Sequence, residues 1–376
     1  MVMGALSRPN FKTASMQVAE TNFALNMLRQ TPASESMVVS PVSVIFALAM
    51  VQLGAKGHTK TQINRVIANG ATDGAIIDFY SSLSKNITNS HGAQAKIANG
   101  LFLNKTFSIE KDYASMIVKK YGAAVKAYDF NQAAKTAKII DNFVRENTDG
   151  KIKNIITANA VKNEVALIVN AIYFKANWYN EFNKRSTTST MFYHSATNKE
   201  KIKFMRVIAK NRLYAENDVV QVLSLPYKDT SYSFNIILPK KKFGLEELRK
   251  KLDGATLQNL LSRLRITLLT ISIPKMKLEK DYNLKKALKA MGVTNLFNRS
   301  LADLTGISKK GLYASEAKHR ALIEVDEKGT TAAAATYIGL RAHSARRPRA
   351  KKFIADHPFI FILTKDRNAL FIGQYV

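Results

Sequence analysis

The stretch EVDEKGTTAAAATYIGLRAHSARRPRAKKF, Glu324 to Phe353, carries the most information about the fold. It begins like a strand, because Val325 alternates with acidic neighbours, and from Gly329 it becomes a run of small residues. Polyalanine favours helix, yet β-branched Thr lies on both sides of this run and no apolar face recurs. Read with the period of a strand, one face is uncharged and mostly small: Thr330, Ala332, Ala334, Thr336, Ile338, Leu340 and Ala342. Such a segment could enter an existing sheet; a flexible linker or a stray helical turn is the alternative.

The composition is that of one large mixed domain. The chain has 376 residues, of which 46% are apolar, and it shows no Pro/Gly/Ser-rich linker, internal repeat or break in composition. We therefore predict a single domain over residues 1–376. The chain has no cysteine, which excludes disulfides, thiolate metal sites and cysteine nucleophiles.

Catalytic motifs are missing from the sequence. No H-E-x-x-H, G-x-S-x-G or G-x-x-x-x-G-K-[ST] pattern occurs, although scattered His, Ser and Asp could still assemble a triad in space. We predict that the protein is not an enzyme and uses no cofactor or metal. Its chemistry would then be performed by a partner.

The N-terminal segment MVMGALSRPNFKTASMQVAETNF lacks the apolar core of a secretory signal, and no run of about 18 apolar residues occurs anywhere. We predict a cytoplasmic or nuclear protein without a membrane span. Removal of a leader would make it extracellular instead, and only then would the sequons at Asn86, Asn104 and Asn298 matter.

Several longer motifs lie in a fixed order around the opening stretch. They are SPVSVIFALAMVQLGAKGHTKTQI (Ser40–Ile63), NGLFLN (Asn99–Asn104), NAIYFKANW (Asn170–Trp178), F-x-x-x-x-T (Phe182–Thr187), IPKMKLEKDYNLKKALKAMGVTNLF (Ile273–Phe297), EKGTTAAAAT (Glu327–Thr336) and the closing HPFIFIL…ALFIGQYV. From about Phe23 to Val376 the chain resembles the serpin family. The resemblance implies an α+β fold with three β-sheets, about eight to nine helices and an exposed reactive-centre loop at about residues 328–353.

The resemblance also implies a mechanism and a monomeric inhibitor. A target serine or papain-like cysteine protease attacks the loop and forms an acyl-enzyme. The cleaved loop then inserts as a new strand of the main sheet, roughly 45 Å long if Thr330 to His343 enter. The tethered protease is distorted before water can release it. The alternative is a non-inhibitory serpin that acts by binding polyanions or partners.

The hinge of the resemblance consists of Glu327, Gly329, Thr330, Ala332, Ala334 and Thr336. A charge or a proline on its inserting face would slow insertion, and this face has neither. Lys328 and Thr331 depart from the Glu often found in inhibitory serpins. Neither departure is expected to disable inhibition, so we predict an inhibitory member.

Two further groups match the machinery that lets the sheet open. Ser40, Ser43, Asn170 and His319 match the shutter, a polar cluster beneath the central strands, although His319 alone would be taken as an ordinary core histidine. Trp178 matches the breach, where the loop first enters, and Lys275 and Glu327 match an ion pair there. Asp141 stands where the family usually has Asn, on a helix that crosses the sheet, and is expected to alter how the sheet opens.

The position of the scissile bond is inferred by counting residues from Glu327 and from Pro358. Sixteen residues after Glu327 the family spacing gives His343–Ser344, whereas counting back from Pro358 gives Arg347–Pro348. Leu340–Arg341 suits papain-like cathepsins, and Arg346 and Arg349 would attract trypsin-like enzymes. We place the cut between Arg341 and Ser344, with Arg341, Ala342, His343 and Ser344 as the candidate residues.

The net charge of +29 comes from 57 Lys and Arg against 28 Asp and Glu. Basic clusters lie at Lys199, Lys201, Lys203, Arg206, Lys210 and Arg212, at Lys240–Lys242, at Arg249–Lys251 and at Arg346–Lys352. Such a surface attracts heparin-like glycans, nucleic acid or other polyanions. The clusters lack interleaved aromatic residues, which argues against base stacking. The segment Phe79–Ser90, which resembles the family's glycan-binding helix, is poor in basic residues.

Overall fold

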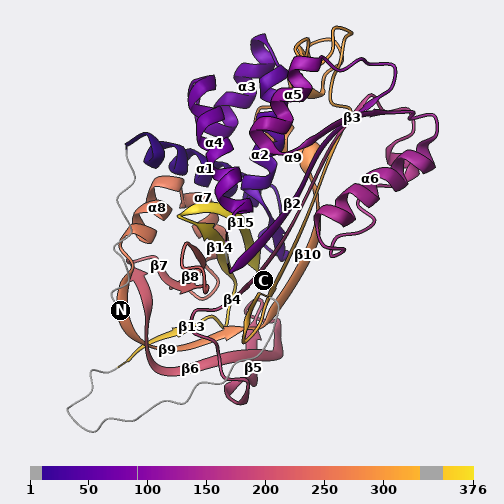
Figure 1. The fold of residues 1–376 in the computed structure, drawn as a ribbon. Helices are drawn as coiled ribbons and strands as arrows, with labels where there is room; N and C mark the ends of the chain where they lie inside the picture. The colour runs from indigo at the N-terminus through magenta and orange to yellow at the C-terminus, as the bar shows by residue number, and fades with distance from the viewer. Residues whose placement is uncertain (1–10, 91, 331–349) are drawn as a thin grey trace.

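The computed structural model describes residues 11–90, 92–330 and 350–376. Its helices α2 to α5 gather at one end of the molecule (Figure 1). The α-helices in the described residues are α1 (Phe11–Arg29), α2 (Pro41–Gly54), α3 (Gly57–Ala68), α4 (Asp73–Thr88), α5 (Lys111–Tyr121), α6 (Ala133–Asn147), α7 (Leu245–Lys251), α8 (Gly254–Ser262) and α9 (Leu284–Ala290). None of these helices is both long and apolar enough to cross a membrane.

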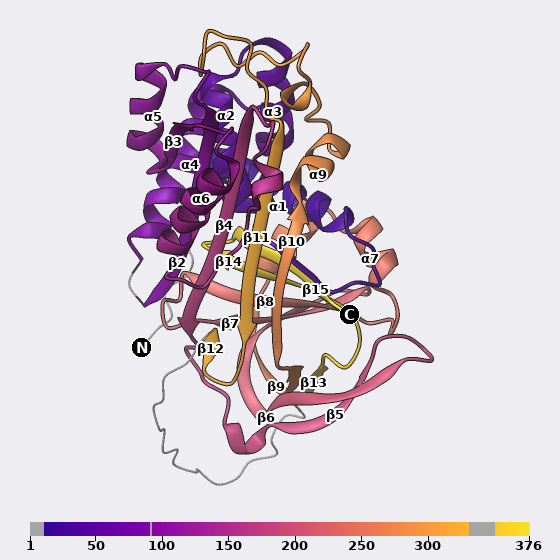
Figure 2. The same ribbon diagram turned by 90° about the vertical axis from the view of Figure 1, so that its right-hand side faces the viewer.

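A six-stranded sheet runs from the helical end toward the opposite end of the molecule (Figure 2). In spatial order its strands are β10 (Met276–Asn283), β11 (Glu316–Val325), β4 (Ala166–Asn177), β2 (Ala93–Asn104) and β3 (Ala124–Tyr128), with the short β12 (Gly329–Thr330) paired to β4. The central strands β4 and β11 are parallel, whereas β10 and β2 flank them antiparallel. Because β4 is covered on both faces, it is apolar along most of its length rather than alternating.

The second sheet has nine strands. Their order is β1 (Met37–Val39), β15 (Asn368–Tyr375), β14 (Phe359–Lys365), β8 (Tyr232–Pro239), β7 (Val220–Pro226), β6 (Lys199–Glu216), β9 (Arg265–Pro274) and β13 (Lys351–Ile354), with β5 (Thr188–Tyr193) paired to β6. The α+β fold predicted from the sequence is confirmed. The resemblance implies three sheets, whereas the described residues form two continuous hydrogen-bonded sheets. The difference arises because the 18-residue β6 pairs with β5 at its start and with β7 at its end, which makes one sheet of these strands. A bulge between Val207 and Lys210 bends β6 while it stays paired with β9.

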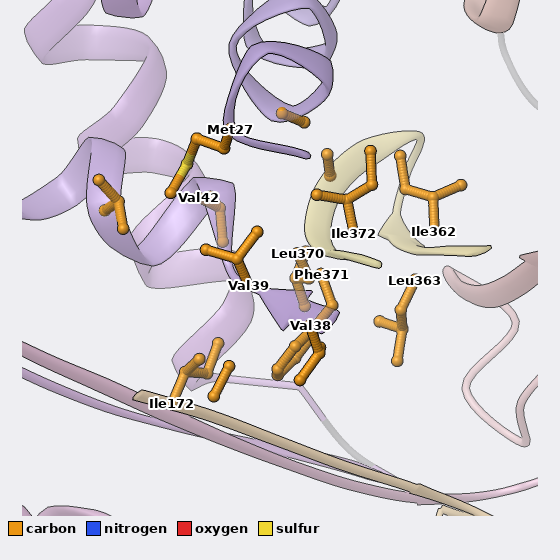
Figure 3. Packing of buried hydrophobic residues seen from close by; sticks show 14 of the residues in the cluster. Met27, Val38, Val39, Val42, Ile172, Ile362, Leu363, Leu370, Phe371 and Ile372 are labelled. Atoms are coloured by element: carbon orange, nitrogen blue, oxygen red, sulfur yellow. The ribbon is translucent and has the colours of Figure 1, made fainter. Parts of the chain in front are cut away.

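Apolar cores lie on both faces of the six-stranded sheet. The larger core fills the space between this sheet, α2 and the nine-stranded sheet, and Figure 3 shows Ile172 of β4 below Val39, Val42 and Phe371. The smaller core lies between the sheet and α6, and Ile140 of that helix belongs to it. Side chains of β4 alternate between the two cores, as the pleat of a strand requires.

Candidate functional site

A buried polar cluster lies beneath the seam between β4 and β11. Ser40 caps α2, because its hydroxyl accepts the Ser43 N–H at 3.3 Å and Pro41 follows at the first helical position. Asn170 on β4 donates to the Ser43 hydroxyl at 2.6 Å and to the Ser43 carbonyl at 3.0 Å. His319 on β11 lies opposite Asn170 in register and bonds to its amide oxygen. The cluster therefore ties α2 to both central strands.

His319 is neutral in this cluster. Its Nε2 accepts the Ser40 N–H at 3.0 Å, so the proton is assigned to Nδ1, which donates to Asn170. Burial lowers the pKa of His319 to about 3, with a smaller opposing effect of the Asp281 carboxylate. Asn99 on β2 completes the cluster by accepting a hydrogen bond from Asn170. Asn99 belongs to the motif NGLFLN, but the motif alone did not reveal this contact.

The seam between β4 and β11 ends where the hinge begins. The two strands pair over seven residues, and the last pair is Tyr173 with Leu322. Farther along β4, Ala176 pairs with Thr330 of β12, so β12 begins where the pairing of β4 with β11 has ended (Figure 2). Thr330 is fully buried, and its hydroxyl lies 3.0 Å from that of Tyr227. The first inserting residue of the hinge is already part of the sheet.

Gly329 is required by the close approach of β12 to β4. Its φ angle is +145°, which side-chain-bearing residues rarely adopt. A Cβ at this position would lie 2.2 Å from the Ala176 carbonyl oxygen and 2.7 Å from the Asn177 Cα. Any larger residue would therefore push β12 away from β4.

Trp178 holds the turn that leads into β12. Its indole N–H donates to the Asp326 carbonyl at 2.8 Å, and its backbone N–H donates to the Lys328 carbonyl at 2.8 Å. The indole also stacks on Tyr227, with ring centroids 4.5 Å apart. Trp178, which directly follows β4, thus connects the turn with Tyr227, whose hydroxyl lies beside that of Thr330.

Glu327 forms the ion pair that the resemblance implies. Its carboxylate accepts Lys275 Nζ at 2.8 Å and the Thr187 hydroxyl at 2.7 Å, and its side chain is only 5% exposed. Burial acts to raise the pKa of Glu327, but the hydrogen bonds from Lys275 and Thr187 outweigh it and hold the pKa below its usual value. The Phe182 N–H also donates to the Glu327 carbonyl at 2.8 Å. Phe182 and Thr187 are the two ends of the motif F-x-x-x-x-T. This motif therefore supplies two hydrogen bonds that hold Glu327, at the start of the hinge.

Asp141 on α6 bonds to the chain that follows its own helix. Its carboxylate accepts the N–H groups of Ile155 at 2.9 Å and Ile156 at 3.2 Å. These bonds fix the segment between α6 and β4. The polar cluster of Ser40, Asn170 and His319 does not include Asp141.

The hinge residues Ala332, Ala334 and Thr336 and the scissile-bond candidates Arg341, Ala342, His343 and Ser344 lie outside the described residues.

The basic clusters differ in how far acidic residues neutralise them. Lys240 pairs with Glu216 at 2.9 Å, and Lys251 pairs with Glu247 at 2.8 Å. The interpretation of Arg249 as part of a surface cluster is wrong. The Arg249 side chain is 6% exposed and donates to the Leu28 and Thr31 carbonyls, so it fastens α7 to the end of α1.

Comparisons with known proteins agree with this geometry. The family model described as "Serpin (serine protease inhibitor)" matches residues 18–376. The chain is 34% identical to leukocyte elastase inhibitor of Equus caballus and 33% identical to Serpin B3 of Homo sapiens, over 96% of this chain and 98% and 99% of theirs. The solved structure of Serpin48 from Tenebrio molitor has a TM-score of 0.85 at 28% identity and covers 99% of both chains. The chain belongs to the serpin family.

Proposed function

We propose that this serpin is a suicide-substrate inhibitor of serine endopeptidases, with papain-like cysteine endopeptidases as further targets. The observation that carries the proposal is the position of Thr330, which is buried and paired with Ala176 at the open end of the seam. The hinge needs no rearrangement of its first residues before the rest of the loop follows. The relative named leukocyte elastase inhibitor supports the same class of function.

The register of β12 predicts where the cleaved loop would lie. In an antiparallel pairing, each residue forward along the loop moves one residue back along β4. Ala332, Ala334 and Thr336 would then lie opposite Phe174, Ile172 and Asn170. Residues opposite each other point to the same face of a sheet, so the small, uncharged face of the loop would be buried. Its alanines would enter the larger core, and Thr336 would meet the polar cluster.

The same register supports the predicted position of the scissile bond. Leu340 would lie opposite Ala166, the first residue of β4. The bonds between Arg341 and Ser344 would then fall just beyond the completed strand. A protease attached there would be carried along the whole length of β4.

The protease performs the bond-breaking chemistry, and the serpin traps the acyl-enzyme by inserting its loop. The protease serine or cysteine attacks a loop carbonyl, the peptide C–N bond breaks, and the new amine leaves with a proton from the protease's general acid. The ester or thioester that remains links the protease to the loop. Insertion must part the seven-residue pairing of β4 with β11 and replace it with two new pairings. We propose that insertion is faster than hydrolysis of the acyl bond.

Incubation with trypsin, chymotrypsin, elastase and a papain-like cathepsin tests the proposal. Denaturing gels should show a stable adduct with at least one serine protease, and mass spectrometry of the released C-terminal peptide should give a first residue between Ala342 and Ser344. Because thioesters are more labile, the cathepsin reaction also needs an activity assay. If every protease cleaves the loop and keeps its activity, inhibition of these enzymes is excluded.

The second candidate is a non-inhibitory serpin that acts by binding polyanions. It is favoured by the lysines on β6, which have no acidic partners among the described residues. Full protease activity after loop cleavage, together with tight binding to heparin, would support this candidate. Residence in the cytoplasm or nucleus and a monomeric state stay predictions.

A further inference from the structure

A pocket of about 560 Å³ lies among the helices α1, α3 and α9. Its lining comes from α1, from α3 and its C-terminal cap, and from the end of α9, and it includes no described residue of the hinge, the polar cluster or either sheet. Pockets of about 300–1,000 Å³ are typical of small-molecule sites. This pocket is therefore large enough for a small organic molecule.

One part of the lining is apolar. Phe23 on α1 is 1% exposed and belongs to the larger core. Val66 on α3 and Met291, which directly follows α9, are half-buried and pack against the same core. A ligand that covered these side chains would remove their remaining apolar surface from water. The lining therefore favours a ligand with an aliphatic or aromatic body.

The polar part of the lining presents hydrogen-bond donors. The amide oxygen of Asn22 accepts the Gly254 N–H at 2.7 Å, and that of Asn26 accepts Arg29 Nη1 at 2.8 Å. The NH₂ groups of these two asparagines form no hydrogen bond with any residue that the structure describes. Because each amide oxygen is already engaged, the two amides can still offer a ligand N–H donors.

Arg65 is the charged residue of the lining. Its guanidinium is exposed and has no ion pair or hydrogen bond within the described part of the chain. Lys286 and Lys289 on the neighbouring α9 are exposed, and their ammonium groups have no described partner either. Among the described residues, no carboxylate lines the pocket. An unpaired guanidinium offers a planar pair of N–H donors that matches a carboxylate.

We propose that this pocket binds a small organic molecule with an apolar body and one carboxylate. The carboxylate would accept hydrogen bonds from Arg65 and from the free N–H groups of Asn22 and Asn26, and the body would cover the apolar part of the lining. A phosphate dianion is less suited, because α3 and α9 both end at the pocket and helix C-termini carry partial negative charge. The site requires neither a protease nor loop insertion, so it goes beyond the proposed function and does not depend on it.

Isothermal titration calorimetry of the uncleaved protein with phenylbutyrate tests the site. This probe combines an aromatic ring, a short aliphatic chain and one carboxylate. Phenylbutanol and phenylbutylamine, which keep the body but lack the carboxylate, should bind at least about tenfold more weakly. Equal affinity for phenylbutanol, or tighter binding of phenyl phosphate, would overturn the assignment to a carboxylate.

The contribution of Arg65 is measured against a matched arginine elsewhere. Arg65→Gln should weaken binding of phenylbutyrate about tenfold, because the carboxylate loses its charged partner. Arg263→Gln removes the same charge from another exposed arginine without a described partner, and it should change the affinity by less than about twofold. Equal losses in the two variants would show that only the net charge attracts the probe, and would overturn the site.

Ala290→Phe tests the position of the site without a change of charge. Ala290 is the exposed last residue of α9 and lines the pocket, so a phenyl group there would take the place of the ligand. We expect at least a tenfold loss of affinity. Ala75→Phe, at an exposed position on α4 outside the pocket, is the control. Phenylbutyrate should raise the Tm of the unmodified protein and of Ala75→Phe, but not that of Ala290→Phe. Unchanged binding by Ala290→Phe would overturn the site.

Discussion

At the scale of single residues, His319 makes the stability of the protein depend on pH. Its pKa is about 3 in the folded protein because of burial, against about 6.5 in an unfolded chain. Between these values the unfolded chain binds more protons than the folded protein. The contribution of His319 to the free energy of unfolding is therefore complete above pH 6.5 and is lost progressively as the pH falls toward 3.

We expect His319→Gln to reduce this acid sensitivity. A glutamine amide can accept the Ser40 N–H and donate to Asn170, but it does not titrate. In urea denaturation between pH 7 and 4.5, the unmodified protein should lose on the order of 2 kcal/mol more than the variant. The control is His58→Gln, the same substitution at an exposed position on α3. Parallel profiles for the unmodified protein and His319→Gln would contradict this account.

We propose that the ion pair of Glu327 with Lys275 helps to keep the sheet closed around the hinge. Glu327→Lys would place a second ammonium beside Lys275 and leave the Thr187 hydroxyl without its acceptor. We expect premature opening of the sheet and polymers on size-exclusion chromatography, with Glu327→Gln as the milder control. A monomeric and fully inhibitory Glu327→Lys protein would show that this ion pair does not restrain the sheet.

At the scale of elements, the pairing of β12 with β4 decides which loop residues must be small. Thr330 points into the larger core beside Tyr227, and the next residue, Thr331, is expected on the opposite face. Thr330→Arg would bury a charge without a partner and should delay insertion until the acyl bond is hydrolysed. We expect a fall in the yield of adduct of about tenfold or more, with the loop still cleaved.

The matched control is Thr331→Arg, which adds the same side chain one residue later. It should keep most of the adduct, because its guanidinium would lie on the face toward α6 and could extend to solvent. Equal yields of adduct from the two variants would contradict the register deduced from β12.

At the scale of the whole molecule, the sequence predicted the features that depend on local runs of residues. The start of the hinge, at Glu327 to Thr330, stands out because a run of small, uncharged residues follows an acidic strand end. Asn170 and Trp178 lie at the two ends of one motif, Asn170 on β4 and Trp178 directly after its last residue, so a single match marked both the polar cluster and the support of the turn.

The sequence could not predict contacts that depend on long-range pairing. Tyr227 supports both Trp178 and Thr330, yet it comes from a loop with no motif. Arg249 was interpreted as surface charge because its neighbours are basic, whereas its burial depends on the end of α1. Glu20 looks like any helical carboxylate, but burial raises its pKa to about 8, partly offset by the hydrogen bond from the Ala369 N–H.

The proposed insertion makes the cleaved loop a strand between β4 and β11. Its most direct test is the thermal unfolding of the protein before and after proteolysis of the loop. Insertion would add backbone hydrogen bonds to both strands, each contributing about 1 kcal/mol, so we predict a Tm at least roughly 20 °C higher after cleavage. Thr330→Arg, cleaved in the same way, should gain much less. A Tm that is unchanged or lower after cleavage of the unmodified protein would contradict loop insertion.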